Sequence, residues 1–274
     1  MQLTKRAGHW LGLILSVAAL AVAAEPAKGV LLENLTWIEA EKVLRPETVV
    51  VIPLGAESKE HGPHLRLKND WLIAEYLKHE VLARADVVVA PTVNYHFYPA
   101  FVDYPGSTSL RLETARDLMV DICRSLARHG PRKFYVLNTG VSTVRALIPA
   151  EEILAKEGII MRHTDILHVA EAVEKEVLKQ EGGTHADEGE TSMMLVIAPE
   201  TVDMSKAVKD FNPDKPGPLT RDPKGAGTYS PTGVWGDATL ATREKGEKLV
   251  HATVEGTLRE IEALRAAPLP AKSN

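Results

Sequence analysis

The 274 residues are 45% hydrophobic and 25% charged, with a formal net charge of −5. This composition suits one α/β domain with a substantial core, and a weakly acidic chain without a basic block excludes nucleic acid as the main partner. Cys123 is the single cysteine, so an intrachain disulfide and a cysteine-rich zinc motif are excluded.

The N-terminus is typical of a secretory signal peptide. Two basic residues at positions 5–6 precede an apolar stretch over 10–22, which ends in small residues. We expect residues 1–24 to be removed near Ala23 or Ala24, leaving a periplasmic or secreted protein without a stable membrane anchor. A short anchor is the alternative, but the stretch is below the ~20 residues that a spanning helix needs.

Strand-like and helix-like stretches alternate over residues 30–268, which we interpret as one domain. Strands are predicted at 49–54, 86–93, 134–137 and 158–161. Helices are predicted at 40–44, 71–82, 112–126, 166–180, 192–197 and 240–266, and a further helix follows the third strand and ends at residue 154. The apolar runs of the strands are continuous, as expected for a sheet covered on both faces. This order predicts a mostly parallel sheet with helices on both sides. Residues 204–237 are rich in Pro and Gly and predict a functional loop or lid.

The loop 57–70 between a predicted strand and helix carries the strongest chemical signal. It contains His61, His64, Asp70 and several glutamates, and it falls at the carboxyl edge of the sheet, where ligands bind in α/β folds. Imidazoles and carboxylates together are a donor set for zinc or manganese. The alternative is a solvated polar loop in which Asp70 is an ordinary helix N-cap.

A second loop, 182–191, adds another imidazole and three carboxylates. Its candidates are His185, Asp187, Glu188 and Glu190. If the two loops converge, one or two divalent ions could be held, and a histidine or carboxylate left off the metal could carry protons. A serine nucleophile is disfavoured, because neither Gly106-Ser107 nor residues 140–142 form a nucleophile elbow.

The segment 94–104 is rich in aromatic residues that could line a pocket for a small-molecule substrate. Packing under a loop explains them equally well. The substrate-binding candidates are His64, Tyr95, His96 and Trp235, with Phe97, Tyr98 and Phe101 as further pocket candidates. Cys123 lies within the apolar face of the helix predicted at 112–126 and is interpreted as a buried structural thiol.

At these loops the chain resembles the creatininase (creatinine amidohydrolase) family. Four segments are similar to family motifs and occur in family order: Gly55…His61-Gly62-Pro63-His64-Leu65…Asp70, residues 104–110 (YPGSTSL), residues 185–192 (HADEGETS), and residues 233–237 (GVWGD) followed by 241–246 (ATREKG). Together they span roughly residues 35 to 260.

The resemblance implies a three-layer α/β/α fold, a tendency to form homo-oligomers, and a dinuclear metal site that hydrolyses C–N bonds of cyclic or formyl amides. By position, His61 and Asp70 would be metal ligands, with Asp70 bridging. Glu188 would be a further ligand, and His185 a catalytic or substrate-contacting residue. Glu190 is assigned with His185 to catalysis.

Two positions depart from the family pattern. The first ligand of the family, a glutamate, aligns with Lys59, whose ammonium cannot bind metal, so Glu57 or Glu60 would replace it, and we favour Glu60. The family's histidine in the loop after the third strand is here Gly140. One ion would then be absent, or His64 or His96 would substitute for the histidine.

We therefore expect an exported hydrolase that depends on zinc or manganese and cleaves a small amide. Lys59 and Gly140 motivate two alternatives. One is a non-catalytic binding protein with the same fold, and the other is a hydrolase with a single metal and a different reaction, such as lactone hydrolysis.

Overall fold

The computed structural model describes residues 27–214 and 217–271. The predicted signal peptide at residues 1–24 lies outside the described residues, so its processing stays a prediction. Among the described residues, no helix is both long and apolar enough to cross a membrane.

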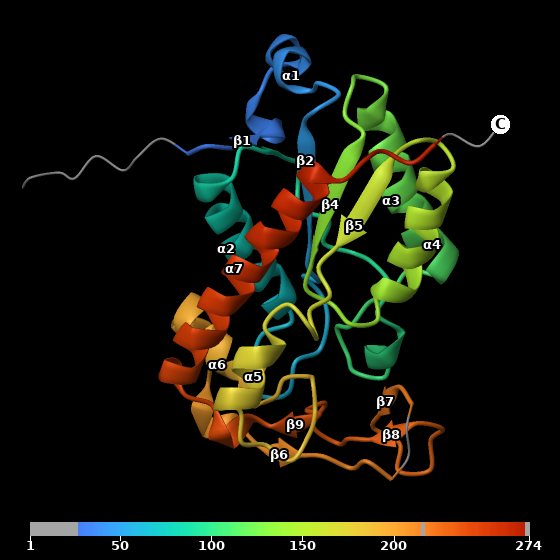
Figure 1. The fold of residues 1–274 in the computed structure, drawn as a ribbon. Coiled ribbons are helices and arrows are strands. Elements are labelled where there is room, and N and C mark those ends of the chain that lie inside the picture. Colours follow the sequence, from blue (N-terminus) through green and yellow to red (C-terminus); the bar gives the residue numbers. More distant parts are fainter. Residues whose placement is uncertain (1–26, 215–216, 272–274) are drawn as a thin grey trace, which may run out of the picture.

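A parallel five-stranded sheet forms the centre of the described chain, in the order β1-β3-β2-β4-β5 (Figure 1). The strands are β1 (Val30–Leu31), β2 (Val49–Leu54), β3 (Val88–Val89), β4 (Lys133–Asn138) and β5 (Ile160–His163). The longest register joins β2 to β4 along six residue pairs, from Val49 opposite Lys133 to Leu54 opposite Asn138. The prediction of a mostly parallel sheet is therefore confirmed.

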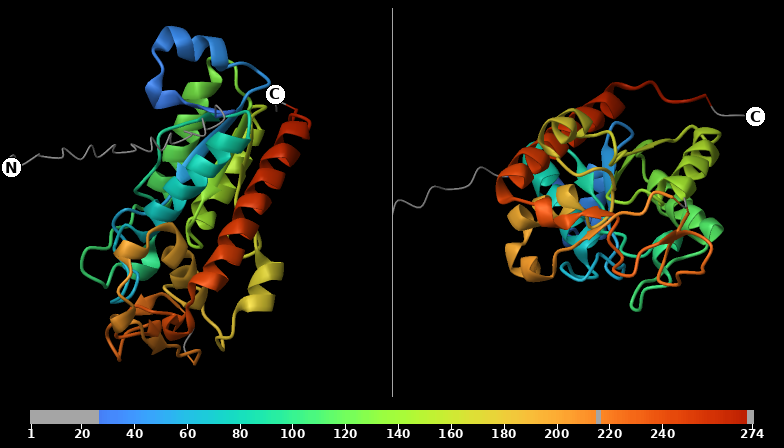
Figure 2. Two further views of the ribbon diagram at one scale, coloured as in Figure 1. Left: turned by 90° about the vertical axis from the view of Figure 1, so that its left-hand side faces the viewer. Right: turned by 90° about the horizontal axis from the view of Figure 1, so that it is seen from below.

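Helices cover both faces of this sheet and make three layers (Figure 2). The helices are α1 (Trp37–Val43), α2 (Asn69–Arg84), α3 (Leu112–Ala127), α4 (Val144–Ala155), α5 (Glu171–Val177), α6 (Glu188–Ile197) and α7 (Arg243–Ala266). Successive side chains of a strand point to opposite faces. Accordingly Val49 and Val51 pack with α2 and α7, whereas Val50, Ile52 and Leu54 pack with α3 and α4. The continuous apolar run of β2 is thus buried on both sides.

Several predicted boundaries shift in the structure. The helix predicted at 166–180 is confined to α5, and the strand predicted at 86–93 to β3. Helix α2 begins at Asn69, so Asp70 lies in its first turn, and the N-cap is Lys68 without a side-chain cap bond. The alternative of Asp70 as an ordinary N-cap is therefore wrong.

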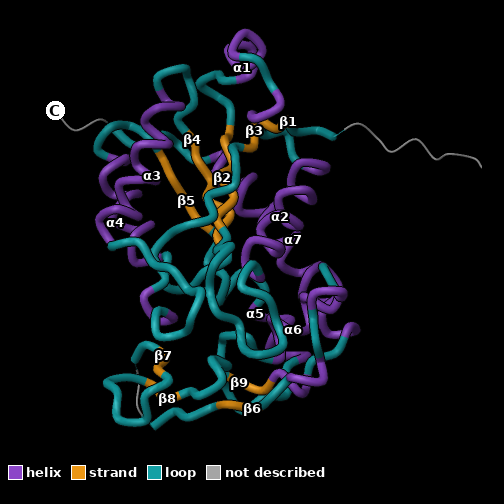
Figure 3. The backbone as a smooth tube through the Cα atoms, turned by 180° about the vertical axis from the view of Figure 1, so that it is seen from behind, coloured by secondary structure: helices purple, strands orange, loops and turns teal. Residues whose placement is uncertain are grey.

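The segment predicted as an irregular loop at 204–237 contains four very short strands. They are β6 (Lys209–Asp210), β7 (Leu219–Thr220), β8 (Thr228–Tyr229) and β9 (Gly236–Asp237). β6 pairs with β9 and β7 with β8, and the views from front and back place both pairs beyond the end of the central sheet (Figures 1 and 3). This segment lies on the same side as the loops that follow β2 and β4.

Candidate active site

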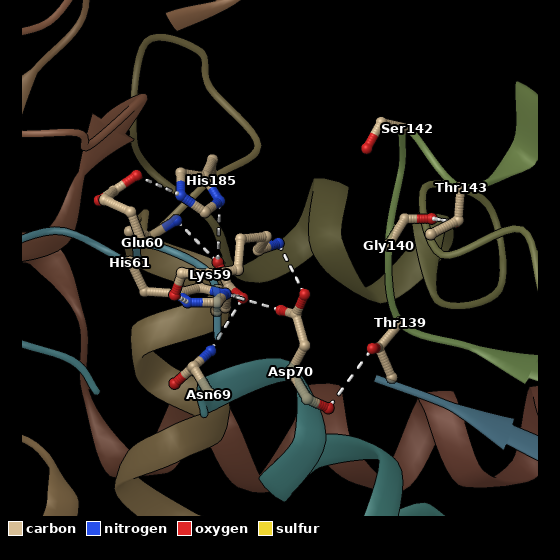
Figure 4. Close-up of polar contacts among 12 residues, drawn as sticks. Lys59, Glu60, His61, Asn69, Asp70, Thr139, Gly140, Ser142, Thr143 and His185 are labelled. Atoms are coloured by element: carbon tan, nitrogen blue, oxygen red, sulfur yellow. Dashed lines mark hydrogen bonds and ion pairs between the residues drawn. The ribbon is translucent and has the colours of Figure 1, made fainter. Parts of the chain in front are cut away.

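Three loops bring polar side chains together at the carboxyl end of the sheet (Figure 4). The first runs from the end of β2 to α2 and carries Lys59, Glu60 and His61. The second follows β4, and the third leads into α6. The carboxyl ends of parallel strands meet at one edge, where backbone amides and helix N-termini are available to anionic groups.

His61 is fully enclosed and held at both ring nitrogens. Its Nδ1 lies 2.9 Å from the carbonyl oxygen of Lys59, to which it donates, and its Nε2 faces two carboxylates. Asp70 Oδ1 is 2.7 Å from this Nε2, and Glu190 Oε1 is 3.4 Å away. A histidine that donates from one nitrogen to a carbonyl presents the other nitrogen in a fixed direction, as metal-ligating histidines do.

Glu190 lies in the first turn of α6 and is oriented by hydrogen bonds to both oxygens. Asn69 Nδ2 donates to Oε1 at 2.9 Å, and the Ala186 amide donates to Oε2 at 2.7 Å. Ala186 has a φ of 48° and is the only described non-glycine residue with a positive φ. Such a backbone conformation is costly for an alanine and persists where the surroundings impose it. Here it directs an amide at the carboxylate.

His185 forms a pair with Glu60 beside Glu190. Its Nε2 lies 3.2 Å from Glu60 Oε2, and its Nδ1 lies 3.8 Å from Glu190 Oε2. Backbone pairing with Trp235 fixes the position of His185, whose ring lies 4.3 Å from that of Phe101 between centroids. The other Glu60 oxygen accepts from the Gly62 amide. A carboxylate on one nitrogen of an imidazole fixes its tautomer and the orientation of its ring.

Lys59 makes a buried ion pair with Asp70, with 2.6 Å between Nζ and Oδ2. The side chains are 6% and 1% exposed. The ammonium also lies over two aromatic rings, 4.7 Å from the centroid of Phe101 and 5.6 Å from that of Tyr98. Asp70 thus has a cationic partner on one oxygen and His61 on the other.

These contacts change the protonation behaviour of the buried groups. Burial opposes the charged form of His61, but the negative charges of Asp70 and Glu190 outweigh it and raise its pKa to about 9. Burial likewise opposes ionised Glu190, yet the charges of His61, His185 and Lys59 hold its pKa well below the usual value. With its proton on, His61 is a cation that compensates these carboxylates.

Ligand atoms of His61, His185 and Glu190 lie within 4.8 Å of one another, close enough to hold a metal ion. Histidine nitrogens with a carboxylate are a donor set for zinc or manganese, so the side chains fit such an ion. A cavity of about 480 Å³ opens beside the cluster, with His185, Glu190 and Lys59 in its wall. Apolar side chains from distant segments complete the wall, among them Phe101, Val141, Leu219 and Trp235.

A sequence profile of the creatininase family, described as creatinine amidohydrolase, matches residues 33–261. The chain belongs to the creatininase family. It is 27% identical over 251 residues to creatinine amidohydrolase of Pseudomonas putida, covering 84% of this chain and 95% of that protein. It is 30% identical over 220 residues to the mycofactocin precursor peptide peptidase of Mycolicibacterium smegmatis, covering 78% of this chain and 84% of that one.

Solved structures agree with the family assignment and with the three-layer α/β/α fold. A structure titled "Creatininase Mn" superposes with a TM-score of 0.74 at 26% identity, covering 87% of this chain and all of that one. A mutant creatininase described as of the Zn–Zn type gives 0.71 at 26% identity, covering 87% of this chain and 99% of the other. The resemblance read from the four motifs is therefore confirmed.

Within this creatininase-family site, Glu188 does not lie where the resemblance placed it. One of its oxygens accepts from the backbone amides of Lys179 and Gln180 at 2.7 Å, and the other pairs with the ammonium of Lys245. Glu188 is fully buried in these contacts and does not belong to the cluster. Glu190, two residues further on, lies in the cluster.

Other predicted residues divide between the site and its surroundings. Trp235 lines the cavity, whereas Tyr95 is exposed and absent from its wall. His64 is buried, with Nε2 2.8 Å from Thr191 Oγ1, and His96 is buried against the Ala115 carbonyl at 3.2 Å. Neither histidine takes the place of the imidazole missing at Gly140.

Glu60 and Glu57, the two alternatives for the family glutamate, both lie outside the three-residue cluster. Glu60 pairs with His185, and Glu57 accepts from Asn94 Nδ2 at 2.8 Å at the surface. Gly233 explains why Glu60 fits, because a Cβ at this position, whose φ is 85°, would overlap the Glu60 carboxylate. The family motif at 233–237 thus makes room for a site residue.

Asn69 and Ala186 contact a site residue but are not among the residues predicted from the sequence. Both act on Glu190, and neither is a residue type that signals metal binding. Asn69 precedes Asp70 at the start of α2, so an amide next to a predicted ligand was a usable signal. Nothing in the sequence shows that the backbone of Ala186 would be turned toward Glu190.

Proposed function

We propose that this chain is a metal-dependent hydrolase that cleaves a C–N bond in a small cyclic amide or a related amide. The observation that carries the proposal is the convergence of His61, His185 and Glu190 at a cavity wall, in a chain of the creatininase family. Relatives with this ancestry are named for creatinine, a dehydro-inosose and a precursor peptide. Amide hydrolysis is common to the first and third of these.

Of this cluster, His61 and Glu190 would hold the ion. Asp70, whose Oδ1 lies 2.7 Å from His61 Nε2, would be the third donor in place of His185, because Glu60 already engages His185 Nε2. His61 Nε2 lies within 3.4 Å of both carboxylates, and these three side chains come from the β2 loop, α2 and α6. A bound divalent ion would polarise a carbonyl group and make water a stronger nucleophile at neutral pH. Asn69, Ala186 and the Lys59 carbonyl would keep the ligands in place.

His185 is assigned to proton transfer. Its ring lies in the cavity wall, and Glu60 engages Nε2 at 3.2 Å. An imidazole paired with a carboxylate can accept a proton from water and return it to a departing nitrogen. Amide cleavage needs both transfers, because the amine leaves only when it is protonated. The cavity is large enough for a small substrate, and its aromatic and aliphatic wall favours an apolar or cyclic one.

Elemental analysis of the purified chain, combined with His61→Ala, tests the proposal. We expect a stoichiometric divalent metal in the natural protein, loss of that metal in His61→Ala, and amide turnover that is abolished by a chelator and restored by zinc or manganese. His79→Ala, a histidine on the exposed side of α2, serves as the matched control and should keep its metal. Turnover of lactones alone would favour lactone hydrolysis over amide hydrolysis, and metal-independent ligand binding would favour a binding protein.

A further inference from the structure

The buried ammonium of Lys59 points to an inference that rests on the proposed metal site. Asp70 lies between His61 on one side and the Thr139–Gly140 segment on the other (Figure 4). On the His61 side, imidazole and carboxylate donors are available. On the other side, the cationic partner of Asp70 is Lys59, 2.6 Å away.

The loop after β4 offers no side chain of the kinds that zinc usually takes as ligands. Residues 138–143 contain no histidine, cysteine or carboxylate. The Asn138 amide is used within the loop: Nδ2 donates to the Gly140 carbonyl at 2.7 Å, and Oδ1 accepts from Thr143 Oγ1 at 2.6 Å. A Cβ at Gly140 would lie 3.3 Å from Tyr98 Cε1, so the Tyr98 ring borders the space where a longer side chain would extend.

A backbone hydrogen bond and two aromatic rings hold Lys59 beside Asp70, in addition to the ion pair. Its backbone amide donates to the Leu67 carbonyl at 3.1 Å, and its ammonium packs over Phe101 and Tyr98. An ion pair this deeply buried is costly to desolvate, so its cation must be matched by Asp70. A divalent ion brought to the same carboxylate oxygen would meet a fixed positive charge.

We propose that the Lys59 ammonium occupies the position of a second cation, so that this chain binds one divalent ion rather than two. The single ion is held on the His61–Glu190 side of Asp70, and Lys59 neutralises the other oxygen of Asp70. By the resemblance to the family motifs, Lys59 stands where a ligand is implied and Gly140 where a histidine is implied, so both departures would act against a second ion at the same place. This chain would differ in metal number from the relative described as of the Zn–Zn type.

Metal stoichiometry tests this inference without relying on activity. The purified protein is stripped with EDTA, loaded with excess Zn²⁺, freed of unbound metal by gel filtration, and assayed for zinc per chain. The natural protein should hold one equivalent. Lys59→Met, which removes the charge without supplying a ligand, should also hold one, and Lys59→Glu combined with Gly140→His should hold two. Lys78→Met removes another buried lysine, which pairs with Glu33, and should leave the value at one.

The outcomes separate this inference from the proposed function. No zinc in the natural protein would overturn both, whereas two equivalents with Lys59 present would overturn the inference and leave the metal hydrolase standing. One equivalent in a double variant with native circular dichroism and cooperative thermal unfolding would also overturn it.

If the double variant does not fold, the Zn²⁺ affinity of Lys59→Met, measured by calorimetry, tests the inference instead. Loss of the repelling charge should tighten Zn²⁺ binding about tenfold relative to Lys78→Met, and equal affinities would overturn the inference.

Discussion

At the scale of single residues, helix geometry decides between Glu188 and Glu190. Both lie in the first turn of α6, two positions apart. Each residue of an α-helix advances by about 100°, so positions i and i+2 face in nearly opposite directions. Glu190 therefore faces His61, and Glu188 faces Lys245. The apolar run from residue 192 predicts a helix that starts one turn too late, so the helical spacing of Glu188 and Glu190 does not follow from it.

Most of the other site residues could be predicted by type but not by role. His61, Asp70, His185 and Glu190 do gather at one edge, as two ligand-rich loops after sheet elements indicate. The ion pair of Lys59 depends on a side-chain direction that residue type does not give. His64 and His96 show the same limit, because a histidine in a polar loop and a histidine buried by packing look alike in sequence.

Substitutions at His185 and Glu60 should lower the catalytic rate without changing the amount of bound metal. In His185→Gln we expect kcat to fall by about 10²- to 10⁴-fold, because proton transfer is lost, while KM changes little. Zinc content should stay at the natural value, since His61, Asp70 and Glu190 remain. Steady-state kinetics with metal analysis on the same preparations measures both quantities. Glu60→Gln should give a smaller loss of kcat, because the imidazole remains but loses its charged partner.

The exposed pair of His168 with Asp165 provides the control for this experiment. His168→Gln should leave kcat, KM and zinc content unchanged. If His185→Gln instead loses its zinc, His185 is a metal ligand, and the assignment to proton transfer is wrong.

His96 should make stability depend on pH. Burial lowers the pKa of this imidazole to about 4 in the folded chain, against about 6.5 when unfolded. Below pH 6.5 the unfolded chain binds a proton that the folded chain refuses, so the free energy of unfolding falls between pH 6.5 and 4. The difference of roughly 2.5 pKa units corresponds to a loss of about 3 kcal/mol.

Denaturant unfolding at several pH values, with His96→Gln beside the natural protein, measures this contribution. Glutamine can still donate to the Ala115 carbonyl but does not titrate in this range, so the variant should lose less stability between pH 6.5 and 4. His79→Gln, at an exposed position, should follow the natural protein. Parallel curves for His96→Gln and the natural protein would contradict the expected neutral, buried His96.

At the scale of elements, apolar runs predict which strands form the sheet better than they predict where each strand or helix begins and ends. The unbroken run of β2 is buried at every residue, and its alternate side chains meet different helices. Strand β1 was missed because it has two residues, too few for any periodicity. The helix predicted at 166–180 shrank to α5, since Leu178 is extended and Lys179 and Gln180 instead turn their amides to Glu188.

The buried ion pair between Glu188 of α6 and Lys245 of α7 should stabilise the packing of these two helices. Its carboxylate is fully enclosed, and the Lys245 ammonium from α7 is its charged partner. In Lys245→Met the carboxylate loses that partner but keeps the two backbone amides. Removing one member of a buried ion pair costs about 3 kcal/mol. We expect the free energy of unfolding to fall by about that amount, with the zinc content of the folded protein unchanged.

Lys248→Met offers a control from the neighbouring turn of α7, because Lys248 pairs with Glu176 at the surface, where ion pairs contribute little. Chemical denaturation of the two variants compares them directly. Loss of zinc in folded Lys245→Met would show that Glu188 has a part in the metal site after all.

At the scale of the whole molecule, the site exists only because segments distant in sequence meet beyond the sheet. The cavity wall takes Lys59 from the β2 loop, His185 from the loop before α6, and Trp235 from the segment that carries the short strands. Strand order and parallel direction were predictable from the alternation of elements. The packing of residues 217–235 against this edge was not, because a segment rich in Pro and Gly has no periodicity to reveal its position.

Export is the remaining expectation for the molecule as a whole, and it governs where the site would meet substrate and metal. Residues 5–22 carry a basic start and an apolar stretch, followed by small residues at 21–24. We propose that the chain is cleaved near Ala23 or Ala24, so that the mature protein begins just before the domain.

Expressed at full length in a Gram-negative host, the protein should appear in the periplasmic fraction, and N-terminal sequencing should start at Ala24 or Glu25. A gene shortened to begin with Met before Glu25 should yield the same folded domain in the cytoplasm. Uncleaved full-length protein in the membrane fraction would instead favour a short N-terminal anchor.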